Sequence, residues 1–377
     1  MTDVLIYGDT IRFPELRHEL PLPVPDPFLY VERDGVKHAV ISSLEIPRLE
    51  ESGGIECHPL EEFGLDELYA QGYSRDDMID EVSLRAVAAL GVTSAVVPYF
   101  FPMLLADRLR EQGVELRVDC ALFDERRRVK SHAELAGIRR AQRAAEAGMS
   151  AARDLLRRAE ASNGVATLDG EPLTSERIKA AISAAFTANN ATADEFVVSH
   201  GPQAAIGHHM GKGPIRVGEA IVIDLWPRDN ESSCYADMTR TFCVGEPSEQ
   251  LREWHRLVKE ALDRTAAALK PGVTGRAVYD VSCDVFEPAG YPTQRTKTPG
   301  ETLGDGFFHA LGHGVGLEVH EAPHLAPGEG ELVAGDVLAV EPGCYRQGLG
   351  GVRLEDLVLV TEDGAEVLTD YPYELEA

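Results

Sequence analysis

The chain has 377 residues, which is long for a single hydrophobic core and predicts two domains. Its formal net charge of -27 argues against nucleic acid and anionic membranes as partners, because both are also negatively charged. No uninterrupted apolar stretch approaches the roughly 18 residues of a membrane helix, and the opening residues, MTDVLIYGDT, lack a basic or long apolar segment. We therefore expect no signal peptide and a cytoplasmic protein.

The first part of the chain alternates short strands and helices. Apolar runs at 38–43, 94–100 and 115–123 favour strands, and residues 76–91 have helical spacing that ends on a glycine. A charged stretch, 124–130, follows, and a new helix starts directly after it. We place a domain boundary there, with one domain at 1–130 and a second at 131–377.

The second part begins with a marked helix start. Ser131 and Glu134 form the S-x-x-E pattern of a capping box, and helical spacing continues to about residue 159. Further elements are expected as helices at about 174–188, 248–269 and 274–287, and as strands at 195–199, 219–225 and 236–244. From 306 onward, short apolar strands alternate with glycine-rich turns. This pattern predicts an α+β domain with an antiparallel or mixed sheet and helices outside it.

The six cysteines are scattered along the chain and include no CxxC pair. Such spacing is typical of free, mostly buried thiols in a reducing compartment, and it does not indicate a disulfide framework or a zinc knuckle.

Four carboxylates and one histidine follow one another in or beside apolar, strand-like segments of the second domain: Asp224, Asp237, His313, Glu341 and Glu355. Taken alone, Asp224 could be a turn residue and Asp237 could pair with Arg240. Burial of an unpaired carboxylate is costly, however, and protonation, an ion pair or a metal is the usual remedy. A shared site accounts for all of them together, and an oxygen-rich set of this kind suits two divalent cations.

Other residues near these segments suit catalysis. His208 and His209 lie in the loop-like stretch AAIGHHMGKG, His320 follows in LEVHEAP, and Arg353 precedes Glu355 by two residues. Each of them could equally be a surface or supporting group. The glycines around His313, in GHGVG, do not match a dinucleotide fingerprint, and we expect them to let the backbone approach a metal or substrate closely.

The amino-acid sequences of these segments resemble those of one known group of enzymes. IDLWP with ADMTRTF, HALGHGVGLEVHE, VEPGCY and GGVRLEDLVLVTEDG, over about 200–370, are similar to motifs of the pita-bread metallopeptidases, in the branch of Xaa-Pro dipeptidase (prolidase) and aminopeptidase P. The resemblance implies an α+β pita-bread catalytic domain preceded by a smaller α/β creatinase-type domain. It also implies a homodimer and a small peptide substrate, whereas the absence of a nucleic-acid or membrane partner is expected from the charge and the lack of long apolar stretches.

The resemblance further implies a set of metal ligands. Asp237 and Glu355 would bridge two divalent ions, Asp224 would hold one of them, and His313 with Glu341 would complete the other. A carboxylate-dominated site with one imidazole favours Mn²⁺, with Co²⁺, Fe²⁺ and Zn²⁺ as alternatives.

The resemblance also implies catalytic roles for residues of this chain. A hydroxide between the two ions would attack the peptide carbonyl, with Glu341 as the general base. His320 and His208 would hydrogen-bond the scissile carbonyl or the tetrahedral intermediate, and Arg353 would bind a substrate carboxylate. His309 and Thr239 would support the ligands.

An Xaa-Pro dipeptidase is the leading expectation, because all five ligand positions are present and the first domain is short. An aminopeptidase P-type enzyme, a metal-dependent hydrolase or lyase of a small non-peptide substrate, and a catalytically silent interaction module stay open as alternatives. One departure concerns the two aspartates, which are mostly about eleven residues apart in the family but thirteen apart here. A longer hairpin turn within PRDNESSCY is the simplest explanation.

Overall fold

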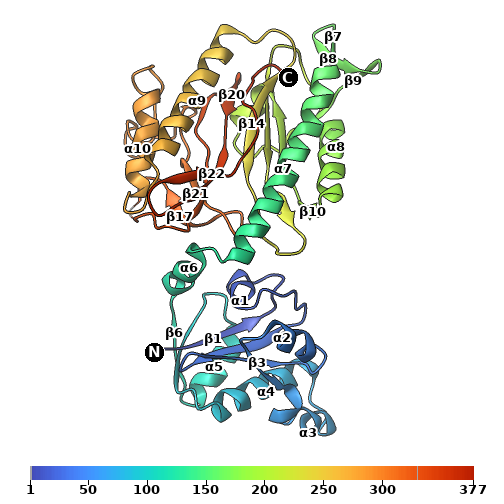
Figure 1. Ribbon diagram of the computed structural model, residues 1–377, viewed down its shortest axis with the longest axis vertical. Helices are drawn as coiled ribbons and strands as arrows, with labels where there is room; N and C mark the ends of the chain where they lie inside the picture. The colour runs from blue at the N-terminus through green and yellow to red at the C-terminus, as the bar shows by residue number, and fades with distance from the viewer. Residues whose placement is uncertain (1, 329) are drawn as a thin grey trace. The chain divides into compact units, whose positions relative to one another are not determined.

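The computed structural model describes residues 2–328 and 330–377 (Figure 1). Its contacts divide the chain into two compact units, Met1–Arg127 and Arg128–Ala377, and each unit has hydrophobic clusters of its own. Within the described residues, no helix combines the length and the apolar character needed to cross a membrane. The cysteines are free, and Cys234, Cys243, Cys283 and Cys344 are buried, as expected.

The N-terminal unit is built on a six-stranded sheet with the strand order β4-β3-β2-β1-β5-β6. Its strands are β1 (Asp3–Gly8), β2 (Phe28–Arg33), β3 (Val36–Ile41), β4 (Glu56–Pro59), β5 (Ser94–Val97) and β6 (Glu115–Val118). The first three strands pair antiparallel, whereas β4, β5 and β6 join by parallel pairing. The sheet is therefore mixed.

Helices cover both faces of this sheet. They are α1 (Pro14–Glu19), α2 (Ile46–Ser52), the 3₁₀ helix η1 (Leu60–Phe63), α3 (Leu65–Ala70), α4 (Arg75–Ala89), α5 (Met103–Glu111) and α6 (Cys120–Arg128). Alternate residues of β1 enter two different clusters, with Leu5 in one and Val4 and Ile6 in the other. Both sets are buried because successive side chains of a strand point to opposite faces.

Two predicted strands are shorter than expected. The strand predicted at 115–123 ends at Val118, and α6 begins at Cys120. Asp119 explains the change, because its carboxylate accepts the N–H of Leu122 at 3.1 Å and thereby caps the new helix. Residues 124–128 of the charged stretch consequently form the second half of α6. The strand predicted at 94–100 ends at Val97, directly before a proline that has no N–H to donate.

The C-terminal unit contains the four helices that the sequence predicts, which are α7 (His132–Arg158), α8 (Ser175–Ala188), α9 (Glu249–Ala268) and α10 (Gly275–Phe286). The capping box is present: the Ser131 hydroxyl accepts the N–H of Glu134 at 3.2 Å, and the Glu134 carboxylate accepts the N–H of Ser131 at 2.8 Å. Short-range sequence signals therefore set the start of α7.

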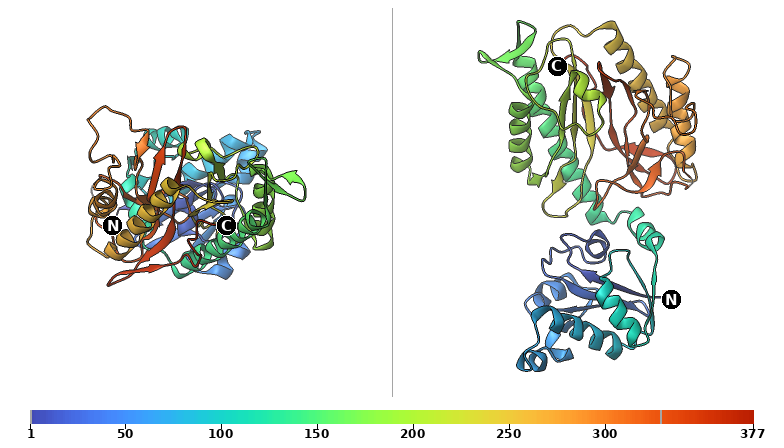
Figure 2. Two further views of the ribbon diagram at one scale, coloured as in Figure 1. Left: turned by 90° about the horizontal axis from the view of Figure 1, so that it is seen from above. Right: turned by 180° about the vertical axis from the view of Figure 1, so that it is seen from behind.

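Short strands lie between the two helix pairs of this unit (Figures 1 and 2). One sheet joins β11 (Val197–His200), β12 (Ala220–Leu225) and β14 (Met238–Cys243). A second joins β17 (Glu321–Leu325), β16 (Gly312–Gly314), β18 (Val337–Val340), β21 (Asp356–Val360) and β22 (Ala365–Val367). A third joins β15 (Asp305–Gly306), β19 (Gly343–Arg346) and β20 (Gly350–Arg353).

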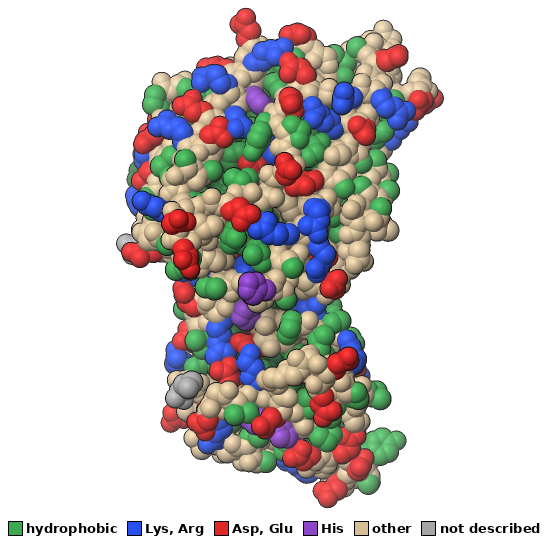
Figure 3. Space-filling view, in the orientation of Figure 1, with side chains coloured by type: hydrophobic (Ala, Val, Ile, Leu, Met, Phe, Trp, Pro, Cys, Tyr) green, Lys and Arg blue, Asp and Glu red, His purple; other side chains and the backbone are tan. Residues whose placement is uncertain are grey.

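Smaller pieces complete the unit. They are β7 (Glu160–Ser162), β8 (Val165–Leu168), β9 (Glu171–Pro172), β10 (Ala191–Thr192), β13 (Arg228–Asp229) and the 3₁₀ helix η2 (Gly201–Ala205). Helices α7 and α8 share a core with β12 and β14, and α9 and α10 share another with β18, β20 and β21. On the face shown in Figure 3, acidic and basic side chains are interspersed, so the excess negative charge does not form one acidic patch there.

Candidate metal centre

The first two candidate ligands are carried by neighbouring antiparallel strands. Asp224 lies in β12, opposite Thr239 of β14, and Asp237 directly precedes β14. The prediction that Asp237 stands inside a strand is therefore wrong by one residue. Because the hairpin between the strands returns the chain antiparallel, two aspartates that are separated in sequence reach the same cavity.

The other candidate ligands come from the two remaining sheets. His313 lies in β16, and Glu341 follows β18, whose last residue pairs with Gly312. Glu355 sits between β20 and β21, and its N–H donates to the carbonyl oxygen of Thr239 at 3.0 Å. This hydrogen bond joins the segment of Glu355 to β14 and so brings the sheets together at the ligands.

These side chains converge in the interior of the unit. Nε2 of His313 is 3.7 Å from Oδ2 of Asp237 and 3.9 Å from Oε1 of Glu341. The ligand atoms of Asp237, His313 and Glu355 all lie within 4.8 Å of one another, and these residues are 4%, 6% and 2% exposed. Together they form a buried group with the composition of a metal site.

The carboxylates repel one another. Burial first, and then the charges of Glu355 and Asp224, raises the pKa of Asp237 well above its usual range. The pKa of Glu355 is raised by burial and then by Asp224 and Glu341. Burial raises the pKa of Glu341 to about 7, although Arg353 opposes this shift. Each of these groups is thus held away from water among charges of its own sign.

His313 is neutral at ordinary pH. Burial, followed by the nearby His320 ring, lowers its pKa to about 4. Nδ1 of His313 is 3.1 Å from the carbonyl oxygen of Gly314, which can only accept, so Nδ1 carries the proton. Nε2 is left with a lone pair directed at the carboxylates, as a metal ligand requires.

Two carboxylate oxygens in this centre have no hydrogen-bond partner among the described residues and are suitable ligands for cations. Oδ1 of Asp224 and Oδ1 of Asp237 are buried and have no hydrogen-bond partner among the described residues. Arg240, the structural partner considered for Asp237, instead pairs with Asp356 at 2.9 Å. A set of close carboxylates with unused oxygens and a neutral imidazole is the donor set that divalent cations prefer.

Arg353 is buried beside these carboxylates. Its Nη2 contacts Asp224, and its Nε lies 3.9 Å from Oε2 of Glu341. Nη1 donates to the hydroxyl of Tyr345 at 3.1 Å, and Nε donates to the hydroxyl of Thr239 at 3.3 Å. The guanidinium therefore neutralises part of the charge of the centre, and its predicted role toward a substrate carboxylate stays a prediction.

Tyr345 is a site residue that sequence reasoning missed. Nδ1 of His309 lies 2.7 Å from the carbonyl oxygen of Ala310 and must donate to it, so Nε2 of His309 accepts from the Tyr345 hydroxyl at 3.0 Å. Tyr345 in turn accepts from Arg353. The sequence offered one signal for Tyr345: it ends the VEPGCY segment, which also contains the candidate ligand Glu341. Thr239 has the supporting position expected of it, since its hydroxyl donates to Oε2 of Glu355 at 2.6 Å.

A cavity of about 560 Å³ opens onto the candidate ligands. All five of them line it, and so do Arg353, His208 and His320. The His320 ring centre is 4.2 Å from that of His313. His209 is not part of the lining; its Nδ1 accepts the N–H of Gly211 at 3.0 Å and shapes the loop. Aromatic and apolar side chains complete the wall: Trp226, Phe308, Met210, Val197 and Val319.

The glycines beside His313 let neighbouring segments pack closely. A side chain at Gly312 would collide with the carbonyl oxygen of Ala339, and one at Gly314 would collide with that of Ala322. A side chain at Gly316 would meet the carboxylate of Glu321. These glycines therefore allow close packing against protein atoms of neighbouring segments, and Gly312 also lines the cavity.

The segment between the two aspartates is an ordered hairpin. Arg228 pairs with Tyr235, and the carboxylate of Asp229, which is 1% exposed, accepts the N–H of Ser232 at 2.8 Å. Arg140 of α7 donates to the same carboxylate at 2.8 and 3.1 Å. The thirteen-residue spacing is thus accommodated by a turn that is bonded to a helix.

Comparisons with known proteins identify the family of this chain and several relatives. The model of metallopeptidase family M24 matches residues 136–362. An Xaa-Pro dipeptidase of Pyrococcus horikoshii is 30% identical over 341 residues, covering 89% of this chain and 85% of that protein. An Xaa-Pro dipeptidase of Pyrococcus furiosus is 39% identical over 181 residues, so the alignment spans only 48% of each chain.

The fold agrees over the full length. A solved structure described as an Xaa-Pro dipeptidase from Bacillus anthracis matches with a TM-score of 0.79 and 24% identity, covering 99% of this chain and 94% of that one. This likeness confirms the expected fold class, a pita-bread domain preceded by an α/β domain. Because the family model spans more than half of the sequence and includes all five candidate ligands, the chain belongs to metallopeptidase family M24.

Proposed function

We propose that this chain is a dinuclear metal-dependent peptidase that hydrolyses Xaa-Pro dipeptides. The observation that carries the proposal is the convergence of two buried carboxylates, two half-buried carboxylates and one neutral imidazole on one cavity. The names of the Pyrococcus relatives support Xaa-Pro bonds as the target. A cavity of about 560 Å³ is within the usual range for small ligands, which favours a short peptide.

Asp224, Asp237, His313, Glu341 and Glu355 would together hold the two ions, with Asp237, His313 and Glu355 at the buried centre of the group. Bound there, divalent cations would activate water and polarise the scissile carbonyl. Mn²⁺ is the first candidate, because carboxylate oxygens outnumber nitrogen in the donor set.

The chain's own groups would manage the protons. Glu341 lies at the cavity wall, so its carboxylate would take a proton from the attacking water and return it to the leaving nitrogen. His320 and His208 also line the cavity and would donate hydrogen bonds to the carbonyl oxygen as charge develops on it. Arg353 would orient Asp224 and could meet a substrate carboxylate.

The test is hydrolysis of a small panel by protein reconstituted with Mn²⁺. The panel contains Ala-Pro, Met-Pro, Ala-Ala, a peptide with N-terminal methionine, and Xaa-Pro-Xaa tripeptides. We expect cleavage of the two Xaa-Pro dipeptides and no cleavage of Ala-Ala. Tripeptide cleavage would reassign the chain to the aminopeptidase P type. Intact substrates throughout, with two metals bound, would refute the proposal and redirect the search to non-peptide substrates.

A further inference from the structure

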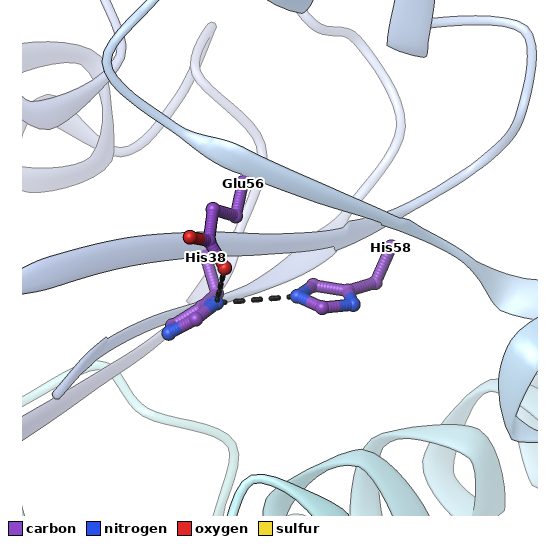
Figure 4. Close-up of side chains that lie close together, drawn as sticks. All are labelled: His38, Glu56 and His58. Carbon is purple, nitrogen blue, oxygen red and sulfur yellow. Dashed lines mark hydrogen bonds and ion pairs between the residues drawn. The ribbon is translucent and has the colours of Figure 1, made fainter.

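Two histidines and a glutamate meet on the six-stranded sheet of the N-terminal unit. His38 lies in β3, and Glu56 and His58 lie in the edge strand β4. The two strands pair in parallel, with His38 opposite Glu56 and Val40 opposite His58. Residues two apart in a strand share a face, so the backbone alone places all three side chains together. Figure 4 shows the two rings and the carboxylate directed toward one another.

The distances among these side chains match the spacing of ligands around a small cation. Nδ1 of His38 is 3.1 Å from Nε2 of His58 and 3.4 Å from Oε2 of Glu56. All three ligand atoms lie within 4.8 Å of one another. Tetrahedral Zn²⁺ with bonds of about 2.0–2.1 Å separates neighbouring ligand atoms by about 3.3 Å. The cluster therefore needs little rearrangement to accept such an ion.

A second carboxylate orients one of the imidazoles. The chain turns after β4 into η1, and Oε2 of Glu62 lies 3.2 Å from Nδ1 of His58. A carboxylate at this distance accepts the N–H of Nδ1, so the lone pair of Nε2 is directed at His38 and Glu56. A carboxylate that holds the far nitrogen of a ligand histidine is a common support of metal sites.

The surroundings allow an ion to enter. The side chains of His38 and His58 are 13% and 18% exposed, whereas that of Glu56 is 64% exposed. Burial lowers the pKa of His38, although Glu56 opposes the shift, so this imidazole is neutral near pH 7. The cluster is thus half-buried, accessible from solvent, and supplied with two imidazoles and one carboxylate.

We propose that His38, Glu56 and His58 form a second metal site, which binds one Zn²⁺ or a similar borderline cation with a water in the fourth position. Two nitrogens and one oxygen differ from the carboxylate-rich donor set of the catalytic unit, and imidazole selects for Zn²⁺ and its neighbours. The competing interpretation is a proton shared by the two rings, which satisfies the same distances without an ion. The proposal does not depend on the peptidase function.

The experiment is Zn²⁺ binding by the full chain at a series of buffered free concentrations, with elemental analysis after dialysis. Zn²⁺ also enters the catalytic centre, so the measured quantity is the difference between native protein and the variants His58→Asn and Glu56→Gln. We expect each variant to hold one Zn²⁺ fewer per chain at a concentration that saturates the native site. Glu62→Gln should retain the site with about 10- to 100-fold weaker affinity.

His18→Asn serves as the matched control, because it removes a histidine from the same unit but outside the cluster, and its zinc content should equal that of the native chain. Far-UV circular dichroism checks that each variant is folded, and the exposed Glu56 makes its variant the safer of the two. Crystals soaked with Zn²⁺ provide a second measurement, in which an anomalous peak is expected between the three side chains. Equal zinc content in the native chain and both variants, or no peak, would overturn the proposal and leave the hydrogen bond between the two rings as the explanation of their distance.

Discussion

Asp237 combines the two properties that make a buried carboxylate costly. It is 4% exposed, and its Oδ1 has no hydrogen-bond partner among the described residues. Its neighbours Glu355, Asp224 and Glu341 are also acidic. Such an arrangement lowers stability unless a cation is present, which agrees with the metal-ligand role that we propose for Asp237.

Replacing Asp237 separates these two effects. Asp237→Asn should raise the free energy of unfolding of the metal-free protein by about 1–3 kcal/mol, because an amide relieves the repulsion and can donate to the neighbouring carboxylates. The same change should release metal and abolish turnover. Urea unfolding in a chelator and elemental analysis measure the two results. Asp154→Asn, at an exposed position of α7, should alter neither. An Asp237→Asn variant with native metal content would contradict the assignment.

Tyr345 links Arg353 to His309 through one hydroxyl. Tyr345→Phe removes an acceptor and a donor in the interior, since the side chain is 1% exposed, and should cost about 1–3 kcal/mol of stability. Turnover should fall about tenfold or more, because supporting contacts hold the groups at the cavity. Denaturant unfolding and steady-state kinetics test both values. The control is Tyr69→Phe, where the ring is 76% exposed, and an effect there as large as at Tyr345 would speak against this role.

At the scale of elements, the hairpin between β12 and β14 carries one aspartate at each end. Its turn is held to α7 by the Asp229–Arg140 pair. Asp229→Ala should cost about 1–3 kcal/mol of stability, because it leaves Arg140 and the Ser232 amide without their acceptor. It should also weaken metal binding, since Asp237 follows the turn directly.

Metal titration and urea unfolding of Asp229→Ala test this prediction. The appropriate control is Glu231→Gln in the same turn, where the carboxylate is 72% exposed and 3.7 Å from Arg140. Exposed pairs contribute little, so this variant should stay within about 0.5 kcal/mol of the native chain. Unchanged metal affinity in Asp229→Ala would show that the turn does not position Asp237.

The other elements differ in how far local sequence determines them. The start of α7 could be read from Ser131 and Glu134, because a capping box is a contact within one turn of helix. The change from β6 to α6 was missed, although Asp119 is also a local cap. There the apolar residues that follow Asp119 continue the preceding strand pattern, and periodicity cannot separate a short strand from the first turn of a helix.

For the whole molecule, the carboxylate centre couples stability to pH. Glu341 has a folded-state pKa of about 7, above the ordinary value of 4.5, so the folded protein binds more protons than the unfolded chain between these values. Stability from this group is therefore present below about pH 4.5 and is lost as pH rises toward 7. His313 has the opposite sign, because its pKa of about 4 makes stability rise with pH up to about 6.5.

A comparison of variants isolates the contribution of Glu341. In a chelator, the free energy of unfolding of the native chain should fall by about 2–3 kcal/mol relative to that of Glu341→Gln between pH 4.5 and 7.5. Added divalent metal should remove this loss in the native chain, because the ions bind the deprotonated carboxylates. Unfolding free energies measured at several pH values, with and without metal, provide the test. A pH-independent difference would mean that the pKa of Glu341 is the same in the folded and unfolded states, and would contradict the prediction.

The sequence by itself determined the chemistry of the site and much of the fold. Residue identity and order indicated Asp224, Asp237, His313, Glu341 and Glu355, and local patterns indicated the helices of the C-terminal unit, because caps and amphipathic spacing act over a few residues. Tertiary structure alone decided that Arg353 contacts Asp224, that Tyr345 joins Arg353 and His309, and that His38 faces Glu56 and His58. These contacts follow from strand pairing between distant segments. Their register depends on packing of the whole unit, which no local pattern encodes.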